Sequence, residues 1–181
     1  MNTWSIITFL SAAIPAVGAG PRFPSAASSK SPDGKWELMC RSPVNGQMDA
    51  GHVLLLTKAG RRSCELRRFE RHCDALWSPD SSHIAVTDWW ASDRADVFLY
   101  DVATPGLGRS VASLVPRTAI PKKEFMGHCY FEASKWLDSH RVQIKVSGHT
   151  DEAPVYNFEH EYAFDLASGR IKKITKIERV R

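Results

Sequence analysis

The chain lacks the common catalytic motifs, and no apolar run in it is long enough to cross a bilayer comfortably. Its 181 residues contain neither an H-E-x-x-H zinc motif nor a glycine-rich phosphate loop. The N-terminal apolar run, Ile6 to Val17, falls short of the roughly 20 residues that a transmembrane helix needs. The 7 histidines are spread evenly and form no cluster in the sequence. We therefore expect no stable membrane span, no metal site and no cofactor.

One segment comes near the nucleophile elbow of the α/β hydrolases. Gly108-Arg109-Ser110-Val111-Ala112 has alanine where that motif has its final glycine, and in the motif a helix follows the serine. Here we expect a β turn followed by a short apolar strand. The sequence therefore predicts that this protein is not an enzyme.

The chain also has only a small excess of positive charge, because 24 Lys and Arg against 20 Asp and Glu give a net charge of +4. The basic residues nevertheless gather between Arg61 and Arg71, just before an aspartate-rich stretch from Asp74 to Asp101. A basic cluster can attract nucleic acid or anionic lipid. Charges on an outer strand also protect an exposed sheet edge from aggregation. We favour the edge and expect no nucleic-acid partner.

The N-terminus has the pattern of a cleaved signal peptide over residues 1–19. Val17-Gly18-Ala19 places small residues at the end of the apolar run, where a signal peptidase would cut after Ala19. Because Met1 to Ser5 contains no Lys or Arg, a retained anchor and a buried strand stay open as alternatives. No cysteine follows the run, so a lipid anchor is not expected. We predict a secreted or periplasmic protein with a flexible lead-in over 20–30, rich in Ser, Ala and Pro, and one domain over 31–181.

In an oxidising compartment an even number of cysteines predicts disulfides. The cysteines are Cys40, Cys64, Cys73 and Cys129, and the sequence leaves their three possible connectivities open. The dipeptides His72-Cys73 and His128-Cys129 raise the alternative of a Cys2His2 metal site. Adjacent residues on a strand point to opposite faces, however, and no C-x-x-C spacing occurs. We favour disulfides.

Three segments repeat one pattern, in which a polar turn containing aspartate precedes an apolar strand. They are Ser31-Pro32-Asp33-Gly34-Lys35-Trp36, Ser78-Pro79-Asp80-Ser81-Ser82-His83-Ile84 and Trp136-Leu137-Asp138-Ser139-His140-Arg141-Val142. Farther along the second and third repeats, the segment from Phe98 to Ala103 recurs as Tyr162 to Ala167. A period of roughly 50 residues is typical of blade-like β architectures.

These residues resemble the TolB-type and prolyl-oligopeptidase-type (WD40-like) propeller blade, in which W-S-P-D-G precedes an apolar strand. Trp77-Ser78-Pro79-Asp80 matches this pattern best; the first copy lacks the Trp and the third lacks the Pro. The resemblance covers roughly residues 30 to 175 and implies a β-propeller with blades at about 31–71, 72–115 and 130–181. It fixes no activity, because the family includes binding scaffolds, translocation partners and peptidase gating domains.

The alternation of side chains predicts an all-β protein with three propeller-like blades in an open, incomplete propeller. In the third repeat Val142, Ile144 and Val146 share one face, and the other face is polar. The second repeat is apolar on both faces. A middle sheet covered on both faces and flanked by one-sided sheets describes an open stack, so we expect a monomer. The alternative is a six-bladed ring of two chains. The segment 106–130 is expected to cover an edge or an end.

The candidate binding residues are Asp88, Trp89, Trp90 and Asp93, which link the two best-formed strands. Adjacent tryptophans in a strand extension cannot both face one core. An exposed indole near carboxylates could stack on a sugar or a cationic group. The alternative is that the second tryptophan packs against the neighbouring blade. Asp88, Asp93 and Asp96 lack the spacing of a standard calcium loop.

The sequence thus predicts an exported, non-enzymatic binding or scaffold module. Its partner would be another protein or a ligand of the envelope or the extracellular space. The alternative is an accessory or remnant of a propeller-gated peptidase whose catalytic domain lies on another chain.

Overall fold

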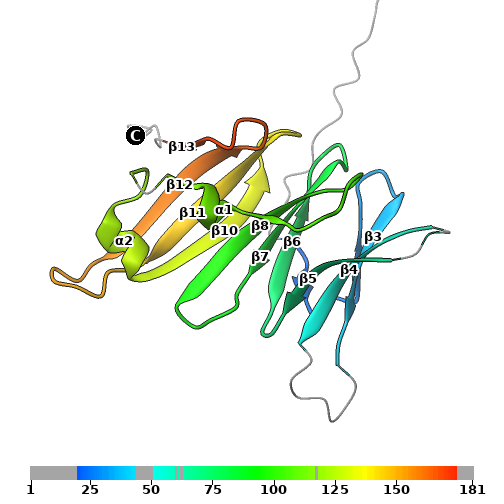
Figure 1. Ribbon diagram of the computed structural model, residues 1–181, viewed down its shortest axis with the longest axis horizontal. Helices are drawn as coiled ribbons and strands as arrows, with labels where there is room; N and C mark the ends of the chain where they lie inside the picture. The colour runs from blue at the N-terminus through cyan, green and yellow to red at the C-terminus, as the bar shows by residue number, and fades with distance from the viewer. Residues whose placement is uncertain (1–19, 44–50, 60, 62, 117, 175–181) are drawn as a thin grey trace, which may run out of the picture.

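The chain folds into three blades of mainly antiparallel strands that follow one another as in a propeller, without closing into a ring (Figure 1). A short parallel pairing joins the second blade to the third. The computed structural model describes residues 20–43, 51–59, 61, 63–116 and 118–174. The predicted signal peptide, 1–19, lies outside the described residues. The predicted class, an all-β fold of three open blades, is confirmed. Within the described part of the chain, no helix has the length and apolarity needed to cross a bilayer.

Each blade is built mainly from strands that follow one another along the chain. Blade 1 contains β2 (Ser28–Lys30), β3 (Trp36–Arg41), β4 (His52–Lys58) and β5 (Cys64–Phe69). Blade 2 contains β1 (Arg22–Phe23), β6 (Cys73–Trp77), β7 (His83–Asp88), β8 (Arg94–Asp101) and β9 (Arg109–Ser110). Blade 3 contains β10 (His128–Trp136), β11 (Arg141–His149), β12 (Asn157–Asp165) and β13 (Ile171–Lys173). Two short helices, α1 (Val111–Leu114) and α2 (Lys122–Met126), lie between blades 2 and 3 in sequence.

The segment 20–30, which we expected to be a flexible lead-in, is structured. Arg22 and Phe23 pair with Asp74 and Cys73 of β6, so the chain enters through the middle blade before it forms blade 1. Phe23 is fully buried in the core between blades 1 and 2. The prediction of flexibility was based on the Ser, Ala and Pro content of the segment and did not take the single aromatic residue, Phe23, into account.

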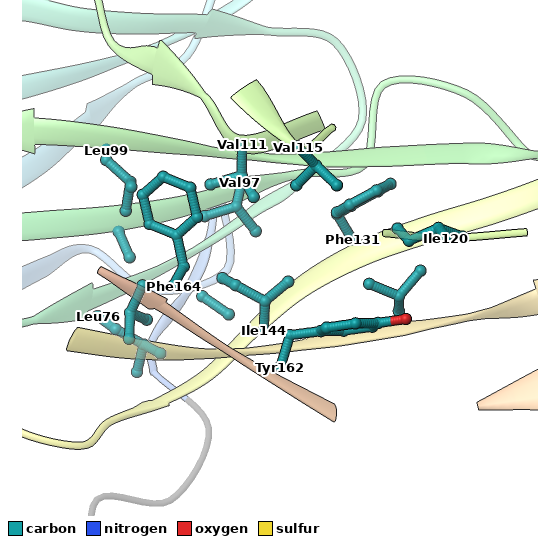
Figure 2. Packing of buried hydrophobic residues seen from close by; sticks show 14 of the residues in the cluster. Leu76, Val97, Leu99, Val111, Val115, Ile120, Phe131, Ile144, Tyr162 and Phe164 are labelled. Carbon is teal, nitrogen blue, oxygen red and sulfur yellow. The ribbon is translucent and has the colours of Figure 1, made fainter. Parts of the chain in front are cut away.

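Blade 2 is covered on both faces, as the sequence predicted. One face, with Val97 and Leu99, packs against blade 3, and the opposite face, with Tyr100 and Val102, packs against blade 1. Figure 2 shows the first of these cores, in which Ile144, Tyr162 and Phe164 of blade 3 meet Leu76, Val97 and Leu99 of blade 2. Burial of two faces by neighbours on either side explains how three blades are stable without a ring.

The segment between blades 2 and 3 covers the edge of the core between these two blades, as expected. Val111 and Val115 of the α1 region and Ile120 are buried in it, and the Tyr162 hydroxyl donates to the Ala119 carbonyl oxygen at 3.3 Å. The expected strand after Ser110 was wrong. A one-turn helix follows instead, and the Ser110 hydroxyl caps it by accepting a hydrogen bond from the Ser113 N–H at 3.0 Å.

The first two aspartate turns have the same pattern of hydrogen bonds, and the third keeps part of it. In the second turn the Asp80 carboxylate accepts from the Ser78 hydroxyl at 2.7 Å and from the Ser82 N–H at 3.2 Å, while the His83 N–H donates to the Ser78 hydroxyl at 2.8 Å. The first turn repeats these bonds with Ser31, Asp33, Lys35 and Trp36. In the third turn Asp138 accepts from two backbone N–H groups. The motif therefore fixes the entry of a strand into each blade.

These turns predict a loss of stability in acid. Partial burial opposes ionisation of Asp80, but hydrogen bonds from Ser78 and Ser82 hold its pKa at about 2, below the ordinary 3.8. A carboxyl whose pKa is lower in the folded state stabilises fully above its unfolded pKa, and this contribution disappears as the pH falls from about 4 to about 2. Asp80→Asn should therefore make the dependence of the urea midpoint on pH shallower over this window. Asp93→Asn is the matched control, and equal slopes in Asp80→Asn and the wild type would contradict the argument.

None of the four cysteines is in a disulfide, which corrects the prediction from their even number. Cys129 is buried in the core between blades 2 and 3, whereas Cys73 and Cys40 belong to the core between blades 1 and 2. The Cys64 thiol donates weakly to carbonyl oxygens, with Pro105 at 3.9 Å. Burial raises the pKa of the Cys73 thiol strongly and that of Cys129 to about 11, so these thiols stay protonated and unreactive.

The basic segment after Arg61 contributes to an outer edge. Its strand, β5, is the last in the order β2-β3-β4-β5, which confirms the edge assignment. One of its arginines, Arg67, nevertheless turns inward toward blade 2.

Candidate functional site

The predicted binding residues lie at the end of blade 2 where β7 turns into β8, and the structure separates them by burial. Asp88 ends β7 and is only 1 % exposed. Its Oδ2 accepts from Nε of Arg67 at 2.8 Å and lies 2.7 Å from Nη2 of the same guanidinium. The Asp88 carboxylate therefore joins blade 2 to blade 1 and does not face solvent.

Trp89 is half-buried and packed. Its indole N–H donates to the Asp74 carboxylate at 2.8 Å, and its ring stacks on His72 with centroids 5.6 Å apart. Tyr130 of blade 3 lies on another side, with ring centroids 5.8 Å apart. These contacts satisfy the polar and the apolar part of the side chain, so Trp89 supports the end of blade 2.

Trp90 is the exposed member of the pair, with 51 % of its surface open to solvent. This agrees with the expectation that the two adjacent rings cannot share one core. Asp93 is also at the surface, where its carboxylate lies 3.7 Å from the Arg94 guanidinium, and its backbone oxygen accepts from the Cys129 N–H at 3.1 Å. Of the four predicted residues, Trp90 and Asp93 therefore have side chains that are open to solvent.

Trp90 borders a groove between blades 2 and 3. The first residues of β8 and β10 pair in parallel through Arg94 and Ala95, after which the two strands diverge. The opening has a volume of about 330 Å³. Its lining is mostly apolar and consists of Trp90, Arg94, Ala95, Asp96, Ala112, Phe125, Cys129 and Phe131. We call this opening the Trp90 groove.

The polar groups of the Trp90 groove are held by internal bonds. The Arg94 guanidinium donates to the carbonyl oxygens of Phe125 at 3.1 Å and Met126 at 3.2 Å, which fixes α2 beside the groove. Asp96 accepts from the Ser110 hydroxyl and from the Ala112 N–H at 3.0 Å. Burial raises the pKa of Asp96 despite these hydrogen bonds. The groove thus has a rigid wall of charged groups and an apolar interior.

The groove does not carry an activated nucleophile among the described residues. The Ser110 hydroxyl is engaged with Asp96 and Ser113, and no described histidine hydrogen-bonds it. The Cys129 thiol is buried, and its pKa is raised to about 11. The arrangement is suited to contact with an apolar group.

Sequence reasoning missed most of the groove. Arg94, Phe125 and Phe131 come from β8, α2 and β10, and only the parallel pairing of β8 with β10 brings them together. The available signal was Phe125, a large apolar residue directly after the charged run Lys122-Lys123-Glu124.

No family model and no curated protein matches the chain. It is similar to the AtxE2 isopeptidase in its apo form, with a TM-score of 0.54 and 14% identity, over 89% of this chain and 30% of that one. A structure of an AtxE2 isopeptidase variant with Astexin3-dC4 bound gives a TM-score of 0.55 and 14% identity, over 90% of this chain and 30% of that one. TolB from Acinetobacter baumannii gives 0.45 and 16% identity, over 82% of this chain and 32% of that one.

The chain thus spans under a third of the isopeptidase's length. At this identity the likeness is one of fold. The chain has the fold of a propeller-type module, with three blades that remain open.

Proposed function

We propose that this protein is an exported, non-enzymatic binding module that holds an apolar side chain of a partner protein in the Trp90 groove. The observation that carries the proposal is an indole 51 % exposed at the mouth of a mostly apolar groove. Tryptophan is among the residues most enriched where binding energy concentrates, because it buries a large area at small cost in conformational entropy.

The shape of the groove supports a protein partner. A volume of about 330 Å³ lies at the small end of the range for ligand sites and suits one anchor side chain with its flanking backbone. Asp93, next to the groove residue Arg94 in sequence, has a partly exposed carboxylate that can accept from a polar group of the partner. Met126, which is 57 % exposed, extends the apolar surface along α2.

The second candidate is an accessory to a propeller-gated peptidase. The similarity to the isopeptidase motivates it, but that similarity covers the fold and leaves about two thirds of the isopeptidase unmatched. We therefore prefer the binding module, acting as a monomer outside the cytoplasm.

Replacing Trp90 tests the proposal. The native partner is captured on the wild-type protein from an envelope or culture-supernatant fraction, identified by mass spectrometry, and purified for direct titration. Trp90→Ala should weaken its binding by about 30-fold or more, as expected for a residue worth about 2 kcal/mol. The Tm should stay unchanged, because the ring is half exposed.

Two control variants make the result specific. Met39→Ala removes a large apolar side chain, 42 % exposed, from blade 1 and should leave binding intact. Trp89→Ala should lower the Tm, because that ring packs on His72 and Tyr130. The proposal is wrong if Trp90→Ala binds the partner as tightly as Met39→Ala does, or if Trp90→Ala unfolds the protein as Trp89→Ala does.

A further inference from the structure

We propose that His128, His149 and Asp151 form a binding site for a divalent transition metal ion, with Zn²⁺ as the reference ion. The site lies at the end of blade 3 beside α2 (Figure 1). Two imidazoles and one carboxylate are a donor set that Zn²⁺ takes in proteins, with further coordination positions left for water or another ligand. The proposal does not depend on the function of the Trp90 groove.

The three side chains converge because of the register of a hairpin. His128 begins β10 and His149 ends β11, and the two residues are directly opposite each other in the antiparallel pair. Their rings stack with centroids 4.0 Å apart and an interplanar angle of 20°. Asp151 follows in the turn after β11 and brings its carboxylate to both rings.

A hydrogen bond accounts for one of the two contacts between Asp151 and the imidazoles, but not for the other. Oδ1 of Asp151 lies 2.9 Å from Nδ1 of His128, but 3.7 Å from Nε2 of His149, which is too long for a hydrogen bond. The three ligand atoms all lie within 4.8 Å of one another. Ligands around a tetrahedral Zn²⁺ at about 2.0 to 2.2 Å are separated by roughly 3.3 to 3.6 Å. Small rotations of these partly exposed side chains would therefore bring the three ligand atoms to the separation that the ion needs.

Glycines permit the close approach of the two histidine-bearing strands. Gly127 precedes His128, and a Cβ atom on it would collide with the carbonyl oxygen of His149. Gly148 precedes His149, and a Cβ atom on it would collide with the carbonyl oxygen of His128. The backbone is thus built so that each histidine rests against the glycine before the other. This reciprocal arrangement holds the backbones of the two histidines close together before any ion binds.

An ion can reach the cluster from solvent. Asp151 is 54 % exposed at its side chain and lines a cavity of about 470 Å³ together with Gly127, Met126, Glu152, Lys122 and Lys123. The cavity supplies the entry path that a metal site needs.

In the sequence, His128 stands beside Cys129, which suggests a metal site only in combination with that thiol. As expected for adjacent strand residues, the Cys129 thiol is buried while the His128 ring stays partly exposed. The second imidazole instead comes from the opposite strand, through a register that the spacing along the chain does not reveal.

Calorimetric titration of the untagged full chain with ZnCl₂ tests the site, with thermal melts and the visible spectrum of a Co²⁺ complex as further measurements. We expect one Zn²⁺ per chain, a rise in Tm with Zn²⁺ concentration, and Co²⁺ bands of nitrogen and oxygen ligation. His149→Ala should abolish the Zn²⁺-dependent rise in Tm. Asp151→Asn, a surface change that keeps the side-chain shape, should weaken Zn²⁺ binding by about tenfold or more. His140→Ala is the matched control and should bind Zn²⁺ as the wild type does.

Absence of a Zn²⁺-dependent rise in Tm in the wild type would overturn the proposal. So would an equal rise in Asp151→Asn, or its loss in His140→Ala. If His149→Ala fails to fold, the Asp151→Asn titration still decides.

Discussion

Phe164→Asp should abolish folding. Phe164 is fully buried in β12, where it pairs with Val142 of β11 and Ile171 of β13. Truncating a buried phenylalanine costs about 3 to 5 kcal/mol, and burying a carboxylate without a partner adds several more. Together these costs reach the whole stability of a typical domain, about 5 to 15 kcal/mol.

The measurement for Phe164→Asp is urea unfolding followed by tryptophan fluorescence, which should show no cooperative transition. Asn157→Asp is the matched control, because it places the same side chain at an exposed position at the start of β12. That control should change the free energy of unfolding by less than about 0.5 kcal/mol. A cooperative transition of near wild-type midpoint in Phe164→Asp would mean that the core between blades 2 and 3 does not hold blade 3 in place.

The side-chain pattern could predict the faces of the blades because a strand alternates with a period of two. The strand β8 has apolar residues on both faces, with Val97 and Leu99 on one face and Tyr100, together with Val102 directly after the strand, on the other. Burial of both faces requires a neighbouring sheet on each side. The aspartate turns were equally readable, because their bonds join residues within five positions of one another, as from Ser78 to His83. Contacts between residues that are close in the sequence can thus be predicted from a local pattern.

The candidate sites depend on contacts that no local pattern contains. The Trp90 groove exists because Arg94 and Ala95 pair in parallel with Cys129 and Tyr130, from a different blade. The even cysteine count gave no information on distance, and the fold distributed the thiols over two cores. Asp88 illustrates the same limit, because the sequence placed it in a surface loop while its partner lies 21 positions earlier in another blade.

The ion pair between Asp88 and Arg67 joins blades 1 and 2. Asp88→Ala should lower the free energy of unfolding by about 3 to 5 kcal/mol, since it leaves the inward-facing Arg67 guanidinium without a counter-charge. Arg67 also lies over the Phe98 ring, 3.5 Å from its centroid, and only 26 % of its side chain is exposed. The guanidinium therefore cannot turn to solvent without losing this packing.

Replacing both partners should be far less costly than removing one. Burial raises the pKa of Asp88 in spite of Arg67, and its Oδ1 has no hydrogen-bond partner among the described residues, so the pair is charged at a considerable desolvation cost. Apolar residues of similar volume avoid that cost. In the double variant Arg67→Met with Asp88→Leu, the free energy of unfolding should therefore be within about 1 kcal/mol of the wild-type value. Urea unfolding should show it to be clearly more stable than Asp88→Ala. If the double variant is as unstable as the single one, the loss in Asp88→Ala comes from a cavity at the junction of blades 1 and 2 and not from the stranded charge.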